Sequence, residues 1–95
     1  MSMSSDEIHA ELGSRLPGWR FEDEALRKRF SFRGFSAAIR FIDRMAEVAT
    51  ASRHHPDFCS HYDVVDVTVT THSAGGVTPA DLALARAIES VADPG

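Results

Sequence analysis

The sequence predicts an α+β domain in which three helices cover one face of a four-stranded antiparallel sheet, in the order α-β-β-α-β-β-α. Three segments carry apolar residues at the spacing of a helix face, and three others alternate apolar with polar residues, as half-buried strands do. The strands come in adjacent pairs with short connections, which is typical of antiparallel hairpins. A length of 95 residues suits one domain, so we expect residues 1–95 to fold as a single unit.

The first helix is expected over residues 5–15. Ser4 and Glu7 have the capping-box spacing that starts a helix. Apolar residues then recur every four positions, at Ile8, Leu12 and Leu16. Pro17 and Gly18 end the helix, because both residue types disfavour its continuation.

The first hairpin follows. Apolar residues alternate with polar ones in residues 19–21 and again in 26–32, with a turn at 22–24 between them. This alternation places Arg27 and Arg29 on the face opposite to the apolar side chains. We interpret the basic cluster formed by residues 27–29 and Arg33 as a solvated strand face.

A longer helix is expected from Ser36 onward, for about four turns. Its apolar residues mark one side of a helix: Ala38, Phe41, Ile42, Met45, Val48 and Ala49. The helix must end before His54-His55-Pro56, because the residue that precedes a proline avoids the helical conformation.

The second hairpin and a third helix complete the chain. Residues 58–62 are expected to form a short strand, and the alternating valines of 65–69 give the clearest strand signal. His72 shares the parity of the polar face of that strand, and Gly75-Gly76 predicts a loop. The last helix is predicted from a cap, a proline at its first position, an acid at its third and an apolar stripe: Thr78, Pro79, Asp81, Leu82, Ala85, Ile88 and Ala92.

Composition and charge exclude several classes of protein. The net charge is −4, all of it from residues 51–95, which is a poor match to a nucleic-acid-binding protein. No apolar run approaches the roughly 20 residues of a membrane helix, and the polar, acidic residues 1–10 argue against a signal peptide. The single cysteine, Cys59, excludes an internal disulfide and fits a cytoplasmic protein. The small core favours a homo-oligomer.

The histidines are the side chains of this sequence best suited to catalysis. His54, His55 and His72 place three imidazoles within 19 positions, and imidazole is the side chain best suited to proton transfer near neutral pH. A metal site of His55, Cys59 and His61 is the first alternative, but these residues lack the paired spacing of known metal motifs, and we expect no metal. A cysteine nucleophile is the second alternative, but we expect Cys59 to be a small buried side chain.

These residues resemble a known family. The run His54-His55-Pro56, five residues, Tyr62, nine residues, His72, eight residues, Asp81 is similar to the signature of the pterin-4a-carbinolamine dehydratases. The similarity extends over roughly residues 12–90, including Pro17-Gly18-Trp19 and the segment from Thr71 to Thr78.

The resemblance implies a function and a set of site residues. It implies dehydration of 4a-hydroxytetrahydropterin to quinonoid dihydropterin without metal or cofactor, which recycles the pterin of aromatic amino-acid hydroxylases. It also implies dimers or tetramers whose sheets join across an interface. His54 and His72 would be the general acid and base, in an order the sequence leaves open, and His55 would bind the pterin. The expected pocket lining and backbone contacts come from Pro56, Phe58, Thr71 and Ser73.

Two positions depart from the family pattern. Thr50 stands where an acidic residue is usual, and Arg53 stands where aspartate or asparagine is usual; the nearest acid is Glu47. A hydroxyl cannot supply the charge of a carboxylate, and a cation beside His54 favours its neutral form. The alternative function is therefore a weakly active or inactive relative that binds a protein partner, such as an assembly factor for Rubisco in carboxysomes.

Overall fold

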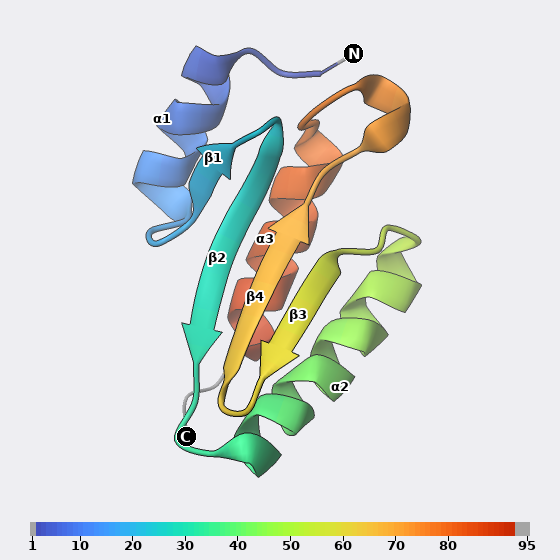
Figure 1. The fold of residues 1–95 in the computed structure, drawn as a ribbon. Coiled ribbons are helices and arrows are strands. Elements are labelled where there is room, and N and C mark those ends of the chain that lie inside the picture. Colours follow the sequence, from blue (N-terminus) through green and yellow to red (C-terminus); the bar gives the residue numbers. More distant parts are fainter. Residues whose placement is uncertain (1, 93–95) are drawn as a thin grey trace.

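The computed structural model describes residues 2–92 and has the predicted α+β architecture and element order (Figure 1). Its helices are α1 (Ser5–Arg15), α2 (Phe35–Ser52) and α3 (Pro79–Val91), with one short 3-10 helix, η1 (His72–Ala74). Its strands are β1 (Arg20–Glu22), β2 (Ala25–Ser31), β3 (Asp57–His61) and β4 (Val64–Val69). Among residues 2–92, none of the helices has the length and apolar character that crossing a bilayer requires.

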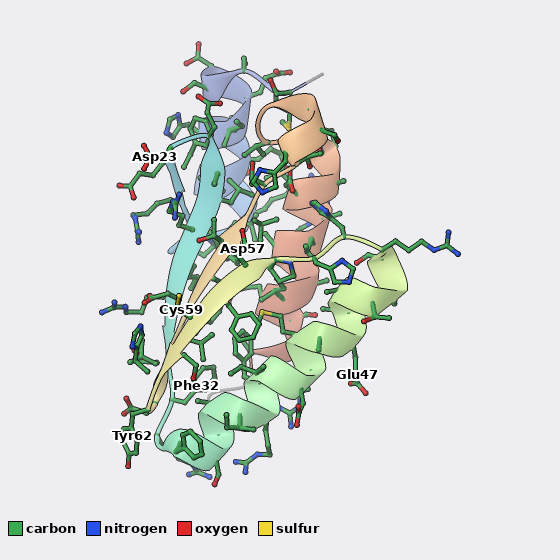
Figure 2. The ribbon with its side chains drawn as sticks, turned by 45° about the vertical axis from the view of Figure 1, so that its right-hand side comes forward. Asp23, Phe32, Glu47, Asp57, Cys59 and Tyr62 are labelled. Atoms are coloured by element: carbon green, nitrogen blue, oxygen red, sulfur yellow. The ribbon has the colours of Figure 1, made fainter. Side chains whose placement is uncertain are left out.

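The four strands form one antiparallel sheet in the order β1-β2-β4-β3. The two predicted hairpins are therefore present, and they join along β2 and β4 in the middle of the sheet. The helices lie to one side of the sheet, as Figure 2 shows in a view turned toward its edge. The other face of the sheet is left open to solvent.

The core fills the space between the sheet and the helices. The valines of β4 that face the helices, Val65, Val67 and Val69, are at most 1% exposed. On the helix side, Phe41 of α2 lies between two aromatic side chains, with ring centroids 4.9 Å from Phe30 and 5.0 Å from Phe32. The apolar residues that alternate along β2 and β4 thus lie on the one face of the sheet that is buried.

One ion pair ties the C-terminal end of α3 to the sheet. Glu89 Oε1 accepts a hydrogen bond from Lys28 Nζ at 2.7 Å and another from the indole Nε1 of Trp19 at 2.8 Å. Lys28 therefore points toward the helices, and the interpretation of residues 27–29 as one solvated face is wrong for Lys28. Its ammonium lies over the Phe30 ring, 4.9 Å from the centroid.

On the open face of the sheet, Arg29 and Asp66 form the best-aligned pair. Both oxygens of Asp66 accept from the Arg29 guanidinium, at 2.8 and 3.1 Å. The hydrogen bonds from Arg29 hold the pKa of the Asp66 carboxyl below its usual value. Arg27 lies on this face too, as its parity predicted.

The second hairpin differs from the prediction in three places. The prediction that Cys59 is buried is wrong, because β3 is an edge strand and Cys59 points to the open face (Figure 2). Tyr62 lies beyond the end of β3, in the turn, with φ at 55°. His72 does not continue the polar face of β4, since the chain coils into η1 and closes with Gly75 in the left-handed region.

Candidate active site

Three segments meet at one end of the sheet. The pairing of Asp57 with Thr68 brings the start of β3 beside the end of β4. The loop before β3 (residues 53–56) and the segment after β4 (70–78) are therefore neighbours. Helix α3 starts directly after that segment, at Pro79. All seven residues that the sequence singled out as catalytic or substrate-binding lie in or next to these segments: His54, His55, Pro56, Phe58, Thr71, His72 and Ser73.

The end of α2 turns the chain toward α3. Arg53 is the C-cap residue and adopts the left-handed conformation, with φ at 56°. Its N–H donates to the carbonyls of Ala49 and Thr50, and the N–H of His54 donates to Ala49 at 3.2 Å. These bonds satisfy the last carbonyls of the helix and fix the direction in which the chain leaves it. The imidazole of His54 is thereby held on the side of α3.

His54 contacts a buried carboxylate. Its Nε2 forms a hydrogen bond with Oδ1 of Asp81, which is fully buried at the start of α3. The other oxygen of Asp81 accepts from the Thr78 N–H at 2.8 Å and from the Thr71 hydroxyl at 2.7 Å. A buried carboxylate is stable only when such partners surround it. With Nε2 engaged by Asp81, Nδ1 is the nitrogen of His54 that remains for other chemistry.

Asp81 thus performs two functions, and the sequence revealed only one of them. Its spacing from Thr78 predicted the capping box that the structure contains. Its contact with His54, 27 positions away in the chain, was not predicted. The available signal was the presence of Asp81 in the family-like signature. The carboxylate beside His54 therefore comes from Asp81 on α3, whereas the family pattern has an acidic residue at the position of Thr50.

A small apolar cavity lies next to this network. His55, Pro56 and Phe58 line it together with Thr50, which extends from α2. Its volume is about 160 Å³, and its remaining walls are aliphatic side chains of α2: Ile42, Met45, Ala46 and Ala49. Phe58 is 46% exposed and forms the outer wall. The predicted substrate-binding residues of this loop therefore share one cavity, whereas Glu47 extends from the outer side of α2 (Figure 2).

The η1 segment forms the other side of the site. His72 and Ser73 are both exposed on this short helix. The loop is closed by two backbone hydrogen bonds between Thr71 and Gly76, at 3.2 and 3.3 Å. The backbone of Thr71 is therefore used within the loop, and its hydroxyl is the group that reaches Asp81. The sequence did not foresee this role of the Thr71 side chain.

The arrangement places a carboxylate-bound imidazole beside a small apolar cavity, and an imidazole held in this way can move protons. Within the part of the chain that the structure describes, no group of three or more histidine, cysteine, aspartate or glutamate side chains could hold a metal ion. The alternative set of His55, Cys59 and His61 is divided by the sheet. His55 lines the cavity on the helix side, whereas Cys59 and His61 share the face of Asp66 and Val64.

Comparisons with known proteins find relatives along nearly the whole chain. The family model for pterin 4 alpha carbinolamine dehydratase matches residues 1–91. A relative from Thermomicrobium roseum, named provisionally as a pterin-4-alpha-carbinolamine dehydratase, is 40% identical over 92 residues and covers 97% of this chain and 99% of its own. A relative with the same name from Metallosphaera sedula is 45% identical over 89 residues, which span 94% and 92% of the two chains.

Two solved structures share the fold. The transcriptional coactivator/pterin dehydratase from Brucella melitensis has a TM-score of 0.92 and 36% identity, over 98% of this chain and all of that one. A pterin dehydratase-like protein that is a RuBisCO assembly factor in the alpha-carboxysome has a TM-score of 0.66 and 22% identity, over 81% and 89% of the two chains. At that identity the second likeness concerns the fold alone.

Proposed function

Because this chain belongs to the pterin 4 alpha carbinolamine dehydratase family, we propose that it removes water from 4a-hydroxytetrahydropterin to give quinonoid dihydropterin. In this reaction the C4a–O bond breaks and the proton on N5 is lost. The electron pair of the N5–H bond forms the C4a–N5 double bond, and the hydroxyl leaves as water after it has received a proton. The protein must therefore deliver one proton and accept another.

We assign the proton transfers to His54 and His72, without specifying which is the acid. Both tasks suit an imidazole, whose unperturbed pKa lies close to neutral pH. We assign His55 to binding and orienting the pterin. On this proposal the reaction needs no metal and no cofactor, because the pterin is the substrate.

The observation that carries the proposal is the contact between His54 and Asp81. A fully buried carboxylate that also receives a backbone N–H and a hydroxyl is rigid, so it fixes the orientation of the imidazole. It also stabilises the imidazolium that forms when His54 takes up a proton, as in other carboxylate–histidine pairs. The cavity beside His55 gives the bicyclic ring a place to bind, with Pro56 and Phe58 as apolar walls.

The polar edge of the pterin would then face η1. The pyrimidine ring carries an amino group and a carbonyl, and these groups require hydrogen-bonding partners when they leave water. We place this edge beside Thr71, against the backbone of Ser73, because the N–H and carbonyl of Thr71 are already bonded to Gly76. The ring atoms C4a and N5 would lie toward His54, since that side chain is held between η1 and the cavity.

A partner-binding relative without turnover is the second candidate. Thr50 and Arg53 favour it, because the cavity wall holds a hydroxyl where a carboxylate is usual and the loop carries an exposed cation. We also propose that the chain forms a homodimer or homotetramer under either function, since so small a core gains stability from association.

The decisive experiment measures the dehydration of freshly generated 4a-hydroxytetrahydropterin by its ultraviolet absorbance. We expect the wild-type protein to exceed the uncatalysed rate by orders of magnitude, and His54→Ala to fall to near that rate. His9→Ala is the matched control, since His9 lies on the exposed face of α1. A folded wild-type protein that does not exceed the uncatalysed rate would overturn the proposal in favour of the partner-binding relative.

A further inference from the structure

The open face of the sheet carries a row of polar side chains across three strands. Arg20 of β1 lies directly opposite Arg27 of β2, and Arg27 lies directly opposite Thr68 of β4. Opposite residues of an antiparallel pair project to the same face, so the two arginines are neighbours. Like charges in this arrangement destabilise a sheet, and a negative group beside both arginines is therefore favourable.

Arg27 is held in one orientation before any ligand binds. Its Nε donates to the backbone carbonyl of Glu22 at 3.2 Å, and its Nη1 donates to the Thr68 hydroxyl at 3.2 Å. Among residues 2–92, its Nη2 has no hydrogen-bond partner. The side chain is only 32% exposed, so a ligand that bonds to this guanidinium has little further side-chain entropy to remove.

The carboxylate of Glu22 marks the place that an anion would take. Its Oε1 lies 3.9 Å from Nη2 of Arg20 and 4.0 Å from Nε of Arg27. Both distances are too long for a hydrogen bond, so Glu22 offsets the two positive charges without bonding to either guanidinium. The side chains of Glu22 and Arg20 are each 58% exposed, which leaves both free to rotate when a ligand enters.

These side chains line a concave part of the sheet, which we call the open-face pocket. Its volume is about 490 Å³, and its charged walls are Arg20, Glu22, Arg27, Arg29 and Asp66. Asp66 neutralises Arg29 through two hydrogen bonds, so the excess positive charge lies at Arg20 and Arg27. A pocket of this size suits a small molecule, and the chain's net charge of −4 disfavours a polynucleotide.

We propose that the open-face pocket binds a phosphate dianion, either free or as the monoester of a small molecule, between Arg20 and Arg27. A guanidinium matches the geometry of a phosphate, whose terminal oxygens can accept from both arginines at once. Glu22 turns away as the phosphate enters. The pocket lies on the face of the sheet opposite to the cavity of His55, so this inference does not depend on the proposed function.

An NMR titration of the full chain with inorganic phosphate tests the site directly. Ionic strength is kept constant with sodium chloride, so that only specific binding of phosphate shifts the amide resonances. We expect saturable shifts in β1, in β2 and around Thr68, with a Kd of about 1 mM or lower. Arg27→Gln should weaken binding about tenfold, because it removes a charge-assisted hydrogen bond. Arg40→Gln is the matched control, since it removes the same charge from the exposed surface of α2.

The variant Glu22→Gln should strengthen binding. It removes the carboxylate that competes with phosphate for the two arginines, and we expect the Kd to fall about two- to fivefold. A gain in affinity cannot arise from a protein that fails to fold. An unchanged or weaker affinity of Glu22→Gln would contradict the placement of the phosphate between Arg20 and Arg27.

A second titration distinguishes the two sources of the phosphate. Adenosine monophosphate is compared with inorganic phosphate, and adenosine serves as the control without a phosphate group. Tighter binding of the monophosphate than of phosphate would indicate a phosphate monoester, and equal binding would indicate the free anion. The proposal is overturned if neither phosphate compound gives saturable shifts in β1 and β2, if adenosine gives the same shifts, or if Arg40→Gln weakens binding as much as Arg27→Gln.

Discussion

Replacing Asp81 with asparagine removes the charge that His54 faces while it keeps the size of the side chain. Asp81 is fully buried, and its two oxygens bond to groups of three residues: the His54 imidazole, the Thr71 hydroxyl, and the N–H and hydroxyl of Thr78. An asparagine has one oxygen, which can remain with Thr71 and Thr78. Its amide group then faces His54 Nε2 as a donor, so the imidazole must move its proton to Nδ1 in order to accept.

The expected magnitudes follow from this geometry. A hydrogen bond to a charged group contributes about 1.5–3 kcal/mol, and Asp81→Asn replaces one such bond by a neutral one, so we expect a loss of about 1–2 kcal/mol in the free energy of unfolding. For a domain of this size that lowers Tm by roughly 5–15 °C. The reversed tautomer withholds the acceptor nitrogen from substrate, so we expect kcat to fall at least about 100-fold.

Circular dichroism melting and the pterin dehydration assay measure the two effects on the same sample. Thr71→Val is the matched control, because it removes a donor to Asp81 but leaves the carboxylate beside His54. We expect it to lose stability with much less effect on kcat. An Asp81→Asn protein that is folded at 25 °C and keeps the wild-type kcat would refute the assignment of Asp81 as the residue that positions His54.

Three further predictions concern other parts of the molecule. Phe58→Ala should raise the KM for the pterin about five- to tenfold with little change in Tm, since the ring is 46% exposed; an unchanged KM in steady-state kinetics would remove Phe58 from the pocket. Glu89→Ala should lower the free energy of unfolding by about 2 kcal/mol in a urea titration, because it leaves an indole N–H and an ammonium without their shared acceptor, whereas Glu89→Gln should lose less. Asp66→Asn should be slightly less stable than wild type at pH 7. Because Arg29 lowers the pKa of Asp66 in the folded state, that difference should persist above about pH 4 and vanish as the pH falls through the lowered value; melting curves at pH 7 and pH 2.5 with the same difference would contradict it.

The sequence predicted the parts of the fold that depend on neighbouring residues. The capping boxes at Ser4 and Thr78 located the starts of α1 and α3, because a cap is a contact over three positions. The start of α2 was less well defined: Gly34 makes no side-chain cap, and the helix has 18 residues, which is about five turns. Strand alternation gave the correct face for Arg27, since it depends only on parity.

What the sequence did not reveal depends on the order of strands and on packing across the sheet. Cys59 was expected to be buried because nothing in its neighbourhood shows that β3 is an edge strand. The contact between His54 and Asp81 needs α3 to pack beside the end of α2, which no local pattern specifies. For the same reason, the position of Tyr62 far from the histidine loop could not be inferred from its place in the signature.

The carboxylate of Asp81 couples the folding of the first turn of α3 to the position of His54. Helix ends open more readily than helix centres, and such local opening needs less free energy than global unfolding. Each time the first turn of α3 opens, the Thr78 N–H loses its acceptor and His54 loses its support together. Hydrogen exchange at the Thr78 amide therefore measures how often the imidazole is released. On heating, catalytic activity should be lost at a lower temperature than the one at which the sheet unfolds.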